Sequence, residues 1–80
     1  MKLPRDVSGD QLARALGALG YVVTRQSGSH LRLSTPLVGG HHLTIPRHPA
    51  LRIGTLSSIL ADVARHHGLD RDQLVGRILG

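Results

Sequence analysis

Residues 21–34 read YVVTRQSGSHLRLS and predict the β-hairpin on which the fold depends. The first half is rich in side chains that favour strands, and Gly28 provides the turn because glycine adopts backbone angles closed to other residues. In the second half, leucines alternate with His30 and Arg32. Since neighbouring strand residues point to opposite faces, burying the leucines turns the imidazole and the guanidinium to the other face.

A third strand is predicted over residues 41–45, where His42 and Thr44 alternate with apolar residues. If the three strands pair as a meander, His42 and Thr44 stand near His30 and Arg32 on the same face. The sequence therefore predicts a surface that carries imidazoles and a cation together.

Along the sequence, helices are predicted before and after the three strands. The first begins at the N-cap Ser8 with a capping-box pattern and ends at Gly20. The second is predicted to be capped by Thr55 and to end at Gly68, and a short third helix starts at Asp70. The order α-β-β-β-α with a C-terminal helix predicts an α+β two-layer sandwich, in which helices cover one face of a three-stranded antiparallel sheet.

Composition indicates which side chains fill the core and which charge a binding partner carries. Tyr21 is the single aromatic residue, so aliphatic side chains must supply the packing. A formal charge of +5 at pH 7 favours a polyanionic partner. The absence of cysteine excludes disulfides and Cys-based zinc sites. No apolar run approaches the ~20 residues that span a bilayer, and no hydrophobic signal segment follows residue 1, so we expect a cytoplasmic protein with no membrane contact.

The uncovered sheet face suggests nuclease chemistry. Cleaving RNA without a metal needs a base for the 2′-hydroxyl proton, donors for the charge developing on the phosphate, and an acid for the leaving oxygen. His30 is a candidate base, and His48 is a candidate acid or phosphate donor. Charge can come from Arg25, Arg32 and Arg47, although ordinary surface charge explains Arg25 and Arg47 equally well.

A metal centre is disfavoured by the placement of possible ligands. The adjacent pairs at 41–42 and 66–67 diverge in a strand or a helix and do not easily chelate one ion. All five carboxylates are aspartates in or beside predicted helices, so none is placed for a two-metal site on the strands. A single adventitious zinc ion, and a phosphate on the backbone amides at 54–55, are left open. We therefore expect no metal and no cofactor.

Three stretches and the first helix together resemble the HicA (YcfA-like) toxins of type II toxin-antitoxin systems. These stretches are residues 25–30 (RQSGSH), 43–48 (LTIPRH) and 54–60 (GTLSSIL), and the resemblance covers residues 3–69. It implies a fold like a double-stranded-RNA-binding domain and a metal-independent endoribonuclease that cuts messenger RNA and inhibits translation. It also implies that His30 is the catalytic histidine, and that a HicB antitoxin binds the toxin and covers the site.

The chain departs from this family in two places. Many members carry a basic residue at the position of Ser27, so one expected phosphate contact is missing or moved. Residues 70–80 lie beyond the shared core of the single domain 1–80. For this segment, packing on the domain, contact with the antitoxin and self-association all stay open.

Two classes of function follow from the sequence. The first is a ribonuclease with His30 as base, and the second is a non-catalytic RNA-binding or protein-interaction module of the same fold. A homodimer and a toxin-antitoxin hetero-oligomer are both open. The residues expected to bind RNA or phosphate are Arg25, Gly28, Ser29, Arg32, Arg47 and His48.

Overall fold

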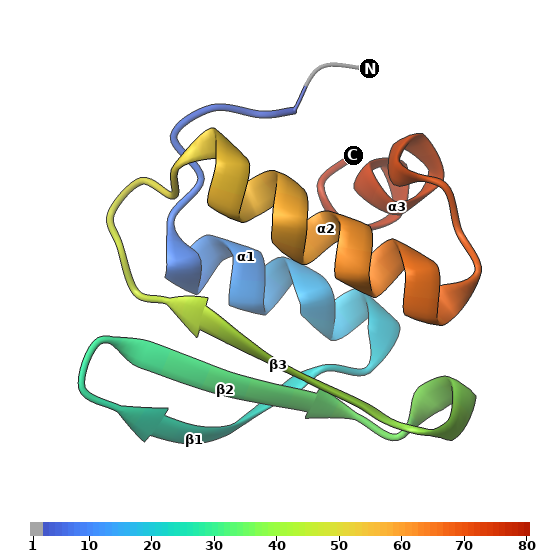
Figure 1. Ribbon diagram of the computed structural model, residues 1–80, viewed down its shortest axis with the longest axis horizontal. Coiled ribbons are helices and arrows are strands. Elements are labelled where there is room, and N and C mark those ends of the chain that lie inside the picture. Colours follow the sequence, from blue (N-terminus) through green and yellow to red (C-terminus); the bar gives the residue numbers. More distant parts are fainter. Residues whose placement is uncertain (1–2) are drawn as a thin grey trace.

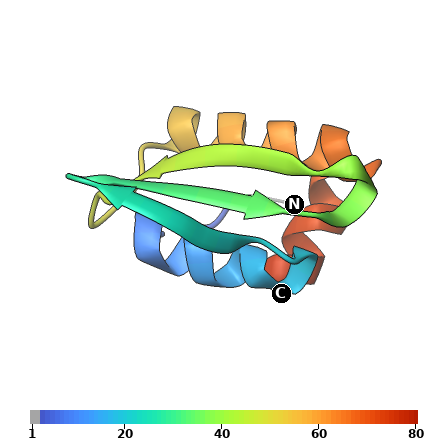
Figure 2. The ribbon, with the colours of Figure 1, turned by 90° about the horizontal axis from the view of Figure 1, so that it is seen from below.

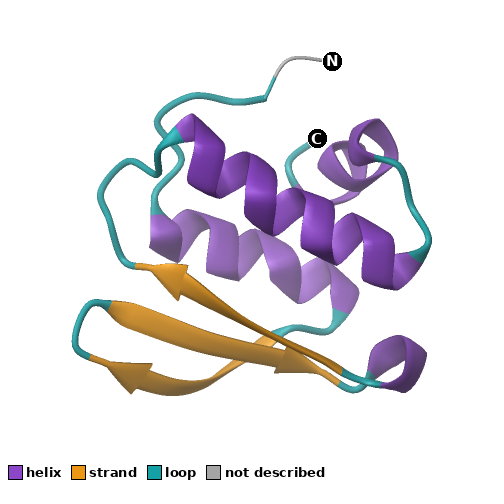
Figure 3. Ribbon diagram, viewed as in Figure 1, coloured by secondary structure: helices purple, strands orange, loops and turns teal. Residues whose placement is uncertain are grey.

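Two helices lie against one face of a three-stranded antiparallel sheet in the computed structural model, which describes residues 3–80 (Figure 1). Figure 3 separates the helical layer from the strand layer by colour. This arrangement confirms the predicted α+β class and element order. In chain order the elements are α1 (Gly9–Ala15), the 3₁₀ turn η1 (Leu16–Leu19), β1 (Val22–Ser27), β2 (His30–Thr35), the 3₁₀ turn η2 (Leu37–Gly39), β3 (His41–Pro46), α2 (Ile53–His67) and α3 (Arg71–Ile78).

The sheet has the order β1-β2-β3, and both neighbouring pairs are antiparallel. Leu31 lies opposite Ile45 and Leu33 opposite Leu43, and all four side chains are buried beneath the helices. His30 and Arg32 are exposed on the other face, as the alternation predicts. Figure 2 looks onto the sheet from the side that no helix covers.

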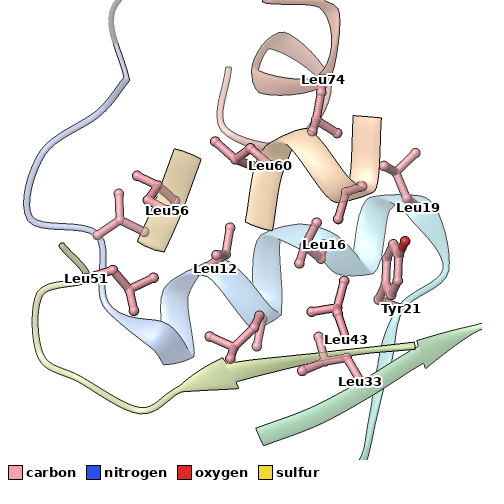
Figure 4. Close-up of a cluster of buried hydrophobic side chains, with 14 of the residues drawn as sticks. Leu12, Leu16, Leu19, Tyr21, Leu33, Leu43, Leu51, Leu56, Leu60 and Leu74 are labelled. Carbon is pink, nitrogen blue, oxygen red and sulfur yellow. The ribbon is translucent and has the colours of Figure 1, made fainter. Parts of the chain in front are cut away.

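The core lies between the two layers (Figure 4). Helix α1 packs on β2 and β3, and α2 packs on β3. All residues of β1 are exposed, and β1 is an edge strand of the sheet. The largest side chains with less than 2% exposure are Leu12, Leu16, Leu33, Ile45, Leu56, Leu60, Leu74 and Val63.

Local signals fix most helix ends where the sequence places them. Ser8 and Asp70 each cap a helix with a complete capping box. Gly20 and Gly68 end helices in the left-handed conformation, at φ of 81° and 68°.

The predicted cap at Thr55 is wrong. Helix α2 begins at Ile53, and its N-cap Arg52 makes no side-chain capping bond. The preceding Leu51 is buried, and its backbone N–H donates to the carbonyl of Val7 at 2.7 Å. Because this anchor fixes the approach of the chain to α2, the helix starts earlier than the local threonine signal suggests.

Helix α3 packs on α2 and η1, beside the end of α2 (Figure 3). Leu74 and Val75 are buried in the same core as the rest of the domain. Of the roles left open for residues 70–80, the structure shows packing on the domain. Within residues 3–80, no helix has the length and apolar character needed to cross a membrane.

Candidate functional site

A hollow lies on the uncovered sheet face, near the turn that joins β1 to β2. We call it the sheet-face hollow, and it is lined by Arg25, Ser27, His30, Arg32 and Thr44. Ser27 lies opposite His30 and Arg25 opposite Arg32 in the β1-β2 ladder, while Thr44 lies opposite Arg32 in β3. Since paired residues share a face, the register brings three strands' side chains to one place. Of the three arginines expected to supply charge beside His30, Arg25 and Arg32 line this hollow and Arg47 does not.

The hollow carries positive charge that the described chain does not neutralise. Among residues 3–80, the side chains of Arg25, Arg32 and His30 make no hydrogen bond and no ion pair. Directly opposed like charges destabilise a sheet. No aspartate lies on a described strand, so the sheet itself supplies no carboxylate to the opposed guanidiniums.

His42 does not join this group. It lies opposite Ser34, whereas His30 lies opposite Pro46 near the hairpin end of β2. The expectation that His42 stands near His30 is therefore wrong, because the register separates them along the strands although they share a face. Thr44 is the β3 residue that reaches the sheet-face hollow.

A second hollow lies at the hairpin turn on the side of α1. We call it the hairpin-tip hollow, and Gly28, Ser29, Arg47 and His48 line it together with Ser8, Asp10 and Pro49. The backbone N–H of Gly9 donates to the carbonyl of His48 at 3.0 Å, which holds this loop against the start of α1. The expected phosphate-binding residues thus fall into two groups, one in each hollow.

Arg47 already has an anionic partner. Its Nε and Nη2 atoms donate to Oδ1 and Oδ2 of Asp10 at 2.9 and 3.0 Å. This pair holds the pKa of the Asp10 carboxyl below its usual value, chiefly through the hydrogen bond from Arg47. The charge of Arg47 is therefore less available to a phosphate than the charges of Arg25 and Arg32.

Gly28 occupies the turn between the two hollows. Its φ is 57°, in the left-handed region that favours glycine. A Cβ built on Gly28 would have no atom within 4 Å, so the turn presents open backbone to an approaching molecule. The expected role of Gly28 in the turn is confirmed, whereas contact with RNA remains a proposal.

Three other histidines form a cluster around the hydroxyl of Tyr21. The hydroxyl lies 2.7 Å from Nδ1 of His41 and 3.0 Å from Nε2 of His67. Nε2 of His41 lies 3.3 Å from a carboxylate oxygen of Asp62, and the ring of His66 stacks on that of His41 at 4.5 Å between centroids. This cluster fastens the starts of β1 and β3 to the end of α2, a role that the sequence did not reveal.

The cluster shifts the titration of two members. Burial, and secondarily the charge of Asp62, raises the pKa of Tyr21 to about 12. Burial lowers the pKa of His67, assisted by the nearby His66 and His41. Throughout residues 3–80, no three His, Asp, Glu or Cys side chains are grouped so that they could hold a metal ion.

Sequence comparison places these features in a known family. The family model described as the HicA toxin of bacterial toxin-antitoxin systems matches residues 9–68. This range runs from the start of α1 to the C-cap of α2 and contains every residue of the sheet-face hollow. No curated protein and no solved structure matches the chain.

Proposed function

Because the chain belongs to the HicA toxin family, and is thus the toxin of a toxin-antitoxin system, we propose that it is a metal-independent endoribonuclease that cleaves messenger RNA and inhibits translation. The observation that carries this proposal is the exposed, unpaired imidazole of His30 beside the unpaired guanidiniums of Arg25 and Arg32. An imidazole supplies the base that RNA cleavage needs, and the guanidiniums supply the charge that holds a phosphate.

In the proposed reaction, His30 takes the proton of a ribose 2′-hydroxyl. The 2′-oxygen then attacks the adjacent phosphorus, the bond to the 5′-oxygen breaks, and that oxygen takes a proton from the solvent that reaches the open hollow. Arg25 and Arg32 stabilise the negative charge that builds up on the phosphate oxygens. The products carry a 2′,3′-cyclic phosphate and a 5′-hydroxyl.

The hairpin-tip hollow extends the proposed RNA path beyond the sheet face. Gly28 and Ser29 present backbone and a hydroxyl there, and His48 presents a second exposed imidazole. We assign His48 to a neighbouring phosphate, because it lines a different hollow from His30. We propose that this activity takes place in the cytoplasm, where messenger RNA is translated. A HicB-type antitoxin that silences the toxin would cover the sheet-face hollow.

The test is cleavage of a single-stranded RNA oligonucleotide in excess EDTA. We expect the wild type to cleave and His30→Ala to lose cleavage, with the fold unchanged because His30 is exposed. His42→Ala is the matched control, since His42 is an exposed histidine on the same sheet face and outside the hollow. A 2′-deoxy nucleotide at the cleaved position should block the reaction. Cleavage by His30→Ala at the wild-type rate would refute the assignment.

A non-catalytic RNA-binding module is the second candidate function. It is favoured by the presence of only one imidazole in the sheet-face hollow, which leaves the leaving oxygen without a protein acid there. This function predicts salt-sensitive RNA binding by the wild type with the RNA left intact. The same EDTA assay separates the two functions.

A further inference from the structure

The edge strand β1 carries a β-bulge next to the sheet-face hollow. Val23 pairs with Leu33, but the next ladder partner of β2, Arg32, pairs with Arg25 rather than with Thr24. Thr24 is therefore the extra residue of the bulge. Bulges of this kind re-aim side chains and are common beside active sites.

The bulge decides which residues of β1 face the hollow. A regular ladder continued from the Val23–Leu33 pair would place Thr24 opposite Arg32 and Arg25 opposite Leu31. Leu31 is 5% exposed and belongs to the helix-covered face, so Arg25 would turn away from His30. One extra residue thus reverses the facing of every later β1 side chain and brings Arg25 onto the uncovered face.

A side-chain hydrogen bond spans the bulge. The hydroxyl of Thr24 donates to the main-chain carbonyl of Arg32 at 3.3 Å. Arg32 is the residue that Thr24 would pair with in the regular ladder, so this bond links the two strands where the bulge interrupts the ladder. A hydroxyl is required for it, and a β-branched residue suits the strand around it.

We propose that Thr24 is a positioning residue of the ribonuclease site: its hydroxyl holds the bulge that places Arg25 and Ser27 on the face of His30. This inference rests on the proposed function, because placing Arg25 on this face affects activity only if Arg25 contacts the RNA. Thr24 itself lies outside the residues that line the hollow and acts through Arg25.

The register can be measured without any cleavage assay. In the wild type, cross-strand nuclear Overhauser effects should connect Arg25 with Arg32. In Thr24→Val, which keeps the shape but lacks the hydroxyl, we expect contacts of residue 24 with Arg32 and of Arg25 with Leu31 to appear. Thr24→Ser keeps the hydroxyl and should keep the wild-type contacts.

Cleavage in EDTA should follow the register. We expect Thr24→Val to lower kcat/KM by on the order of 10-fold to 100-fold, because Arg25 would turn to the other face and the hollow would lose one of the two guanidiniums that stabilise the phosphate charge. Thr24→Ser should stay within about threefold of the wild type. Ser58→Ala is the control, since it also removes a hydroxyl, from an exposed residue of α2 that lies outside both hollows.

Deleting Thr24 gives a further test. Removal of the extra residue lets Arg25 pair with Arg32 in a regular ladder, so the deletion variant should still cleave RNA. If this variant shows that pairing but no longer cleaves, the threonine contacts the RNA directly and the positioning role is wrong.

Other outcomes separate this inference from the proposed function. An unchanged register and unchanged kcat/KM in Thr24→Val would overturn the positioning role even where His30→Ala confirms the ribonuclease. Self-association of Thr24→Val with the register intact would also overturn it, because the bulge would then serve only to protect the exposed edge of β1. If no RNA is cleaved by the wild type, the register measurement still tests the structural role of Thr24.

Discussion

Within residues 3–80, Arg25 and Arg32 have no anionic partner, whereas Arg47 is paired with Asp10. The two kinds of arginine should therefore contribute differently to the salt dependence of RNA binding. Each phosphate contact made to single-stranded nucleic acid contributes a slope of about −0.7 to the dependence of log K on log salt concentration. The unpaired guanidiniums of Arg25 and Arg32 would together give about −1.4. The guanidinium of Arg47 is held by Asp10, so we expect it to add little.

These slopes give measurable differences in affinity. Raising salt from about 50 to about 200 mM should weaken binding about sevenfold for two contacts and about 2.6-fold for one. We therefore expect Arg25→Gln to flatten the slope by about 0.7, and Arg47→Gln to leave it nearly unchanged. Fluorescence anisotropy with an RNA oligonucleotide measures both, with His30→Ala as the background so that the RNA stays intact.

The slopes measured for Arg25→Gln and Arg47→Gln can contradict this expectation. If Arg47→Gln flattens the slope as much as Arg25→Gln does, Arg47 leaves Asp10 and binds phosphate in the complex. The hairpin-tip hollow would then contribute as much to the electrostatic contact with the RNA as Arg25 does on the sheet face. A slope that Arg25→Gln does not change would refute phosphate binding by Arg25.

Three further predictions concern stability. The folded state should lose stability as pH falls through about 6.5, because the lowered pKa of His67 means that the unfolded chain binds more protons there; urea unfolding at a series of pH values measures this loss. Stability should also fall above about pH 10, because Tyr21 keeps its proton up to about 12 in the folded state, and Tyr21→Phe should remove this alkaline decline while costing about 1–3 kcal/mol at neutral pH. Leu16→Ala should cost about 2–5 kcal/mol, because Leu16 is fully buried at 0% exposure; a loss below about 1 kcal/mol would contradict the described core.

Alternation and capping predict the fold because each depends on short-range chemistry. The leucines of β2 leave only one face for His30 and Arg32, and a one-residue shift would expose both leucines. The capping boxes at Ser8 and Asp70 need only residues three positions apart. Signals of this range are fully contained in the local sequence.

The features that the sequence did not predict correctly depend on contacts between residues that are distant in the sequence. Thr55 is a reasonable local cap, but the start of α2 depends on Leu51 meeting Val7. The separation of His42 from His30 depends on the register between β2 and β3, which the turn residues did not specify. The Tyr21 cluster joins residues from three elements, so no local pattern indicates it.

The bulge explains why the sequence pattern predicts the facing of His30 and Arg32 but not that of Arg25. Strict alternation from Val23 would send Arg25 to the helix side, so the sequence pattern alone cannot place it beside His30. The bulge opposes Arg25 and Arg32, an arrangement that repulsion between like charges penalises in the free domain. If RNA binds here as proposed, its phosphate chain would remove that penalty by placing negative charge between the two guanidiniums. The same contact would then weaken the isolated sheet and strengthen the proposed complex with a polyanion, as expected for a site shaped by binding and not by stability.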